Sequence, residues 1–395
     1  MNKTLTIRSF HSEKTDKGCN VVFGLTIGEN SYDLHYDILG EGIEVVPERC
    51  DSVVIMFLLF AIKKGYDIQS DYPISRKLYY NMTKHIIPQL CVCNKNARKI
   101  KLTMPLTEDV YCGTWRGTGV SLGVDSFTTI HEYTDDCILD EYKLTHLVHL
   151  KTGSHCVYRN IDQYDGKTEI ELFNKEHELV EQYCNKNHFE LITIETNLHQ
   201  IMCSEGEHKF SPFCTVRNLG AIMLLQSYFD KYYYASSYNL DQFMIDLNVD
   251  SSHYEKWMIP LLATENITFY SSNEEMSRSE KVEYISKFSD TYDSLHVCWL
   301  SGNNCGKCAK CVRTITQLDL LGVLDKYEEC FNLEEYKSHR KQYFNQVVAR
   351  KNVDPFCKEI YLYMRQKQMK TPSFLAVLPT MLKLFINRTK RNIKK

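Results

Sequence analysis

From about Tyr111 onward, short apolar runs alternate with longer amphipathic runs, and this alternation constrains the fold more than any other feature of the sequence. The strand-like and helix-like runs follow one another in the order 144–150, 166–186, Leu191–Glu195, 213–229 and Tyr232–Ala235. Such alternation is typical of an α/β fold, in which parallel strands form one sheet and helices cover both of its faces. We therefore expect a doubly wound parallel sheet in this part of the chain.

The residues on either side have different patterns. Three alternating runs, separated by glycine-containing turns, predict antiparallel strands at 3–8, 20–27 and 32–38. Two apolar or amphipathic runs predict helices at 51–64, with Asp51 as its N-cap, and at 74–90. One short run predicts a further strand at 99–104. Beyond about residue 330 the sequence is helical and polar. The expected organisation is an N-terminal α+β accessory domain (1–105), an α/β domain (106–330) and a helical C-terminal segment with a basic tail (331–395).

Composition excludes several classes of protein. With 43% hydrophobic and 25% charged residues, the chain has the composition of a globular protein rather than a disordered one. A net charge of -3 gives no global attraction to nucleic acid or anionic lipid. The N-terminus lacks the apolar core of a signal peptide, and the longest apolar run, Val53–Ile62, is about half of the roughly 20 residues that span a bilayer. We expect a cytoplasmic protein without a transmembrane segment, in which most of the 16 cysteines are reduced.

The segment from Thr118 to Ile130 has the composition of a phosphate-binding loop. A glycine-containing strand passes through a turn of small residues into an amphipathic helix. Glycine lets the backbone approach an anion, Ser121 and Ser126 add hydroxyl donors, and the helix N-terminus contributes partial positive charge. From the residues alone, the alternative is an ordinary helix capped by Ser121 or Asp125.

The loop residues Ser121, Gly123, Val124, Asp125 and Ser126 resemble the S-G-G-x-D-S motif of the PP-loop ATP pyrophosphatases, which belong to the adenine nucleotide alpha hydrolase-like superfamily. Leu122 stands where that family usually has its first glycine. The resemblance implies a HUP-like fold, binding of ATP and Mg²⁺, and cleavage of ATP to AMP and pyrophosphate.

Four cysteines, Cys298, Cys305, Cys308 and Cys311, lie within fourteen residues of one another. Four thiolates at this spacing can close a tetrahedron around Zn²⁺, and Gly306 lets the backbone turn around the metal. An iron–sulfur cluster is the competing interpretation, because ferredoxins also use C-x-x-C-x-x-C. We favour zinc, in a structural role because protein ligands fill all four positions.

The loop and the cysteines together resemble the 7-cyano-7-deazaguanine synthases, over about residues 115–320. Arg217-Asn218 resembles the G-R-N element of that family, Lys281 matches its lysine before the cysteines, and Gly153 falls where it has a glycine near the nucleotide. The resemblance implies an ATP-dependent ligase that adenylates a carboxylate or amide and couples it to ammonia or an amine. It assigns catalytic roles to Asp125, Ser126, Arg217 and Lys281.

Two other functions remain open: a PP-loop enzyme that modifies RNA, and a zinc-stabilised nucleotide-binding accessory protein of a defence or surface-polysaccharide system. The basic tail, from Pro372 to Lys395, offers a contact for RNA or a partner protein, and a solvated terminus is the alternative. The resemblance also allows a homodimer. We interpret His146 and His149, on the strand before Gly153, as core histidines rather than catalysts.

Overall fold

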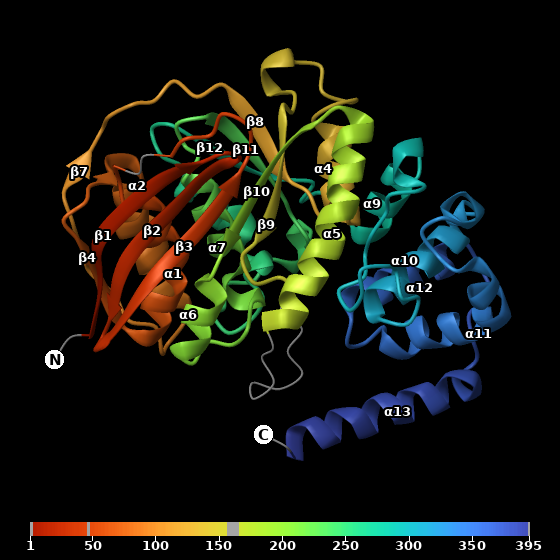
Figure 1. Cartoon of the computed structure of the whole chain (residues 1–395). Coiled ribbons are helices and arrows are strands. Elements are labelled where there is room, and N and C mark those ends of the chain that lie inside the picture. The colour runs from red at the N-terminus through yellow and green to blue at the C-terminus, as the bar shows by residue number, and fades with distance from the viewer. Residues whose placement is uncertain (1–2, 46–47, 156–165, 394–395) are drawn as a thin grey trace. The chain divides into compact units, whose positions relative to one another are not determined.

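The computed structural model describes residues 3–45, 48–155 and 166–393 and has an α/β fold built on one large, mostly parallel sheet (Figure 1). The ten strands of this sheet are β1 (Lys3–Thr15), β2 (Gly18–Ile27), β3 (Asn30–Leu39), β4 (Tyr66–Ser70), β6 (Leu102–Thr103), β8 (Trp115–Gly119), β9 (His146–Lys151), β10 (Glu190–Thr196), β11 (Phe229–Ala235) and β12 (Thr268–Ser272). They lie in the order β12-β11-β8-β9-β10-β3-β2-β1-β4-β6. A separate pair joins β5 (Ile74–Ser75) to β7 (Leu106–Thr107).

The three predicted N-terminal strands are confirmed, and they extend the large sheet. β1 pairs with β2, and β2 with β3, in antiparallel register, as their alternating apolar residues predict. β3 then pairs antiparallel with β10, for example Ile38 opposite Ile194. One sheet therefore runs across the boundary expected near residue 105.

Five strands, β12, β11, β8, β9 and β10, are parallel to one another and form the half of the sheet that the helix–strand alternation predicts. β8 comes first in sequence but lies in the middle, with β9 and β10 on one side and β11 and β12 on the other. Because these strands are parallel, their carboxyl ends meet at one edge of the sheet. In open α/β sheets, ligands bind at this edge, near the point where the strand order reverses.

The α-helices are α1 (Asp51–Lys64), α2 (Arg76–Asn81), α3 (Ile87–Cys93), α4 (Val124–Glu132), α5 (Gly166–Asn187), α6 (Leu198–Ser204), α7 (Cys214–Met223), α8 (Glu255–Met258), α9 (Arg278–Ile285), α10 (Ala309–Leu320), α11 (Leu333–Arg350), α12 (Pro355–Gln366) and α13 (Phe374–Ile393). Helix α1 packs along α7. On strand β9, Val148 belongs to the hydrophobic core shared with α1 and α7, whereas the next residue, His149, contacts Phe173 of α5. Successive strand residues point to opposite faces, so helices cover both faces of the sheet at β9.

Some element boundaries differ from the expected ones. Asp51 is the first residue of α1 rather than its N-cap, which is Cys50, because the Asp51 carboxylate instead accepts hydrogen bonds from the Ser75 amide and the Gln226 side chain. The strand expected at 99–104 is only Leu102–Thr103, where the chain pairs with β4. The helix expected at 213–229 ends at Met223, and the chain then turns into β11.

The chain forms two compact units, each described here by itself. The first comprises Met1–Ser121 and Thr129–Glu274 and contains the whole large sheet. The second comprises Leu122–Thr128 and Glu275–Lys395. Within the second unit, α10 packs against α9, α11 and α12, and α13 lies along α11. The division thus falls at Glu274, upstream of the boundary expected at 330.

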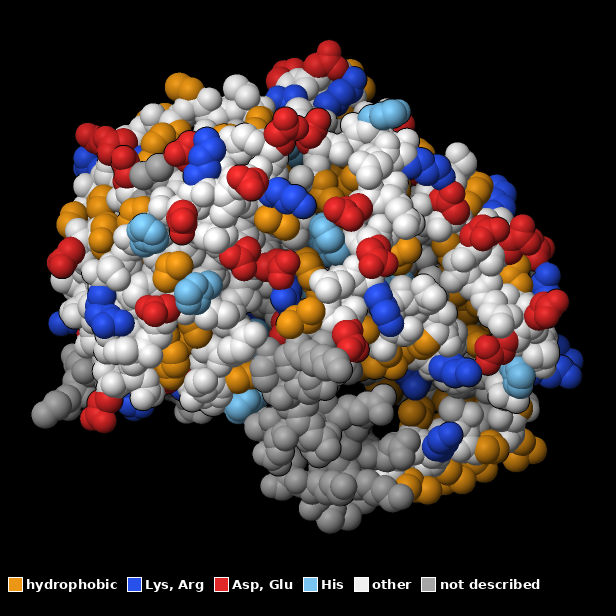
Figure 2. Space-filling view, in the orientation of Figure 1, with side chains coloured by type: hydrophobic (Ala, Val, Ile, Leu, Met, Phe, Trp, Pro, Cys, Tyr) orange, Lys and Arg blue, Asp and Glu red, His pale blue; other side chains and the backbone are white. Residues whose placement is uncertain are grey.

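Surface features bear on the expected partners. Among the described residues, no helix combines the length and the apolarity needed to span a bilayer. Acidic and basic side chains are interspersed on the face seen in Figure 2. Several apolar side chains of α13, including Phe374, Leu375 and Phe385, are exposed. The basic side chains of the tail, from Arg388 onward, lie outside the described side chains, so the expected contact stays a prediction.

Candidate functional site

The predicted phosphate loop lies between the end of β8 and the start of α4. Leu122, within this turn, has a φ of 53°, in the left-handed region that favours glycine. Its side chain is buried, and its carbonyl accepts a hydrogen bond from the His296 amide at 2.8 Å. A leucine therefore holds the backbone conformation that a glycine would adopt most easily.

The other loop residues differ in exposure. Ser121 is exposed and Gly123 is half-buried, whereas Val124 and Ser126 are buried. Gly123 supplies the carbonyl that accepts the Phe127 amide hydrogen bond at 2.9 Å, which closes the first turn of α4. The first amides of a helix have no acceptor within the helix, so this turn is suited to an anion.

Asp125, in the first turn of α4, is held by two cations of α9, all three within the second unit. Arg278 Nη1 donates to Asp125 Oδ2, and Lys281 Nζ lies 3.3 Å from Asp125 Oδ1. The two cations share a face of α9 because they are three residues apart, and a capping box of Ser277 and Glu280 fixes the start of that helix. Asp125 and Lys281, both predicted site residues, are thus brought together.

The charges of this cluster favour an anion as its ligand. Lys281 is fully buried, with 0% of its side chain exposed, and Asp125 retains 22%. Burial opposes ionisation of Asp125, but the charges of Arg278 and Lys281 outweigh it and lower the pKa of the carboxyl. Asp125, Arg278 and Lys281 carry one negative and two positive charges, a combination that suits phosphate oxygens, although the Glu359 carboxylate also interacts with Arg278.

A second cluster, in the first unit, joins the predicted residues Gly153, Arg217 and Asn218. Gly153 follows β9 with a φ of 115°, and a Cβ atom there would lie 2.9 Å from Arg217 Nη1 and 3.0 Å from His199 Nδ1. Thr152 Oγ1 donates to Asn218 Oδ1, and Asn218 Nδ2 donates to the Tyr234 hydroxyl at 3.3 Å. Glycine is favoured here because a φ of 115° strains any side chain, and a Cβ atom would also crowd Arg217 and His199.

The contact between Arg217 and His199 determines which nitrogen of the histidine ring carries the proton. Arg217 is fully buried in α7 and donates from Nη1 to His199 Nδ1 at 2.9 Å. Since a guanidinium can only donate, Nδ1 must be the acceptor, and the ring proton is then on Nε2, which faces Cys203 Sγ at 3.4 Å. Burial, and then the charge of Arg217, lower the pKa of His199 to about 3, so the ring is neutral at pH 7.

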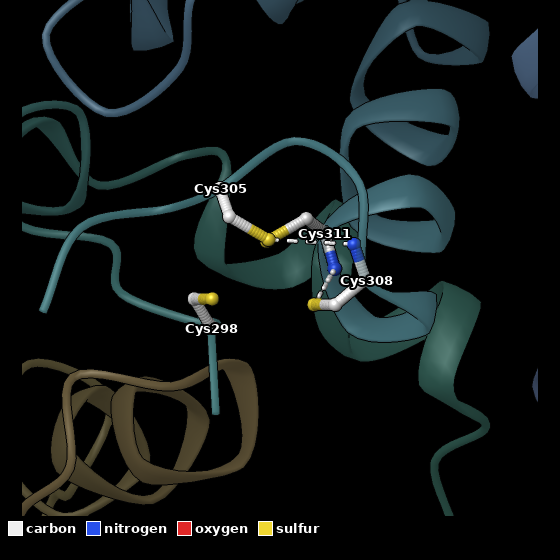
Figure 3. Close-up of side chains that lie close together, drawn as sticks. All are labelled: Cys298, Cys305, Cys308 and Cys311. Carbon is white, nitrogen blue, oxygen red and sulfur yellow. Dashed lines mark hydrogen bonds between the residues drawn. The ribbon is translucent and has the colours of Figure 1, made fainter. Parts of the chain in front are cut away.

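The four predicted cysteines form one cluster in the second unit, between the loop at Cys298 and the start of α10 (Figure 3). Their sulfur atoms all lie within 4.8 Å of one another, and the distance between Cys305 Sγ and Cys311 Sγ is 4.0 Å. Gly306 has a φ of 65°, as expected for a turn around a metal. Zn–S bonds of about 2.3 Å give tetrahedral edges of about 3.8 Å, so the cluster could hold a metal ion such as zinc.

Backbone amides point at these sulfur atoms. The amide of Cys308 donates to Cys305 Sγ at 3.3 Å, and the amide of Cys311 donates to Cys308 Sγ at 3.4 Å. Hydrogen bonds from the Cys308 and Cys311 side chains lower the pKa of Cys298, and contacts within the same group raise the pKa of Cys308 and of Cys311. Donors aimed at sulfur stabilise thiolates, the form that binds metal.

Comparison of the chain with protein-family models, with curated proteins and with solved structures found no match. The functional argument therefore depends on the residues and their geometry.

Three residues of these clusters were not singled out from the sequence. Arg278 lies three residues before Lys281, and this spacing is the signal that could have found it. Thr152 and His199 carry no local signal, because their contacts with Asn218 and Arg217 join segments 66 and 18 residues apart.

Proposed function

We propose that this chain is an ATP-dependent ligase of the PP-loop type, similar to the 7-cyano-7-deazaguanine synthases. The observation that supports it most is the pair of cations, buried Lys281 and Arg278, that holds Asp125 at the first turn of the helix after the loop. A buried lysine is costly unless it is paired or serves a charged ligand. In this proposal, the loop amides and these two cations bind the phosphates of ATP.

The reaction has two steps. An oxygen of the substrate carboxylate or amide attacks the α-phosphorus of ATP, and pyrophosphate leaves. Ammonia or an amine then attacks the activated carbon, and AMP leaves with its bonding electrons. Lys281 and Arg278 would neutralise the charge on the departing pyrophosphate, which is the largest electrostatic requirement of the first step. The nucleotide contacts that the resemblance assigns to Gly153, Arg217 and Asn218, all in the first unit, stay predictions, as does the doubly wound, HUP-like arrangement.

Mg²⁺ has no fitting protein site at Asp125. Both carboxylate oxygens already face cations, whereas Mg²⁺ requires oxygen ligands with negative charge to spare. In this proposal, Mg²⁺ therefore enters as part of the ATP substrate. The carboxylate of Asp125 instead fixes the positions of Arg278 and Lys281.

The test measures ATP binding by calorimetry and AMP formation from ATP labelled at the α-phosphate, with Mg²⁺ and a small-metabolite extract of the native cells. Lys281→Met should lower AMP formation about 100-fold or more, because one preorganised charge is lost from the site. Lys287→Met is the matched control, since Lys287 is an exposed lysine two residues beyond the same helix. It should leave both measurements unchanged.

Full ATP binding and AMP formation by Lys281→Met would contradict the proposal. ATP binding without AMP, in wild type, would favour the accessory protein. AMP formed only when RNA is added would favour the RNA-modifying enzyme.

A further inference from the structure

Two histidines and a glutamate form a second cluster of metal-binding side chains, in the first unit and separate from the cysteines. His149 lies on β9, His155 follows that strand, and Glu176 lies on α5; one ligand atom from each lies within 4.8 Å of the others. His149 Nε2 is 3.3 Å from Glu176 Oε1, and His155 Nε2 is 3.2 Å from Glu176 Oε2.

These distances match the edges of a metal coordination sphere. Zinc binds histidine nitrogen and carboxylate oxygen at about 2.0–2.2 Å, and a tetrahedron with such bonds has edges of about 3.3–3.5 Å. Each of the two nitrogen–oxygen distances is close to one such edge, although they end on different oxygens of Glu176, and one ligand atom from each of the three side chains lies within 4.8 Å of the others. His149 and His155 both direct Nε2 toward the same carboxylate, and their rings are nearly perpendicular, at 89°.

The ligands are held in place by rigid surroundings. His149 is 1% exposed, and its ring stacks on Phe173 with centroids 4.7 Å apart. Its second nitrogen, Nδ1, lies 3.1 Å from His177 Nδ1, and His177 Nε2 lies 3.4 Å from Glu181. His155 Nδ1 is 3.1 Å from the Ser154 hydroxyl. Outer partners of this kind orient metal-binding histidines and fix which nitrogen faces the ion.

We propose that His149, His155 and Glu176 form a second transition-metal site, which binds Zn²⁺, with His177 as an outer partner that orients His149. Imidazole nitrogen with one carboxylate is a donor set for zinc and its neighbours rather than for Mg²⁺ or Ca²⁺. Three protein ligands leave one position for water or for an oxygen of a small molecule, whereas the four cysteines leave none. The buried position predicted for His149 is confirmed, and the proposal adds a metal-binding role to it.

The experiment counts Co²⁺ ions bound by the full chain and records their absorption spectra. Cobalt bound to cysteine gives thiolate charge-transfer absorption, and cobalt bound to nitrogen and oxygen does not. We expect the wild type to bind one ion without that absorption. Glu176→Gln and His155→Ala should each abolish this ion, and His177→Ala should weaken its binding about 10–100-fold.

Two controls separate this site from others. His35→Ala removes an exposed histidine of the same unit and should bind the ion as the wild type does. Cys308→Ser should lose only the ion with thiolate absorption. Circular dichroism checks that each variant is folded; Glu176→Gln keeps the size of the side chain, and His155 lies outside the helices and strands, so at least one of the two should fold.

A wild type without the nitrogen–oxygen ion would overturn the proposal and leave a hydrogen-bonded cluster. So would full occupancy in folded Glu176→Gln or His155→Ala, or loss of the ion in His35→Ala. Because the readout is metal content and spectrum rather than ATP turnover, these outcomes are independent of the proposed ligase activity.

Discussion

Gly153 is the residue whose replacement is most sharply predicted. Its φ of 115° is strained for any side chain, and a Cβ atom would crowd Arg217 and His199. We expect Gly153→Ala to lower the free energy of unfolding by about 2–3 kcal/mol in urea. Gly42→Ala is the control, because Gly42 also has a positive φ, of 70°, but no atom within 4 Å of its Cβ position. An equal loss in both variants would mean that crowding by Arg217 and His199 adds nothing to the strain of a positive φ.

For individual residues, the sequence predicts that side chains form a cluster when those residues are close together in the chain. The four cysteines span fourteen residues, so their spacing alone predicts that their sulfur atoms meet. His149 and Glu176 are 27 residues apart on a strand and a helix, and nothing local indicates that they face each other. Gly153 and Arg217 were singled out separately by resemblance, but their contact is a property of the fold.

The turn from β8 into α4 shows how an element can keep a conformation without its usual residue. Leu122 has positive φ and a buried side chain, so backbone strain and burial oppose each other. Left-handed backbone costs a non-glycine residue about 1–2 kcal/mol. We therefore expect Leu122→Gly to be more stable than Leu122→Ala by about 1 kcal/mol in urea unfolding, since both variants lose the side chain and only glycine relieves the strain.

The control is the same pair of substitutions at Leu318, which is buried within the helix α10. There, glycine should be about 1 kcal/mol less stable than alanine, the ordinary order for a helix. The ordinary order at both positions would contradict the left-handed conformation of Leu122.

Elements with a clear local pattern were predicted well, whereas two short strands, β4 and β12, were not predicted. The alternating residues of β2 and β3 and the apolar run of α1 determine those elements locally. The strands β4 and β12 have five residues each, too few for a period to stand out. Their strand conformation depends on pairing with β1 and β11, which the sequence does not reveal.

At the scale of the whole molecule, the large sheet joins two groups of strands whose sequence patterns differ. The pairing of β3 with β10 links residues more than 150 positions apart, and it makes the N-terminal strands continuous with the parallel strands. Local patterns predict that both groups of strands exist, but the edge at which they meet depends on tertiary packing. Local sequence patterns do not determine the order in which such distant segments lie in the sheet.

The two compact units lead to a prediction about metal and stability. All four cysteines belong to the second unit, and α10, which begins directly after Cys308, packs against α9, α11 and α12. If an ion at the cysteines contributes folding free energy, its loss should first weaken this unit. We expect Cys308→Ser, or a chelator added to the wild type, to speed amide hydrogen exchange about tenfold or more in α9–α12.

Exchange in the strands of the first unit should change much less, because their hydrogen bonds lie within the sheet. Cys330→Ser is the control: Cys330 belongs to the same unit, and its thiol donates to the Tyr292 carbonyl at 3.2 Å, a bond that a serine hydroxyl can replace. Equal acceleration in both units would mean that they unfold together. No acceleration in either unit would mean that no metal at the cysteines contributes to the stability of the second unit.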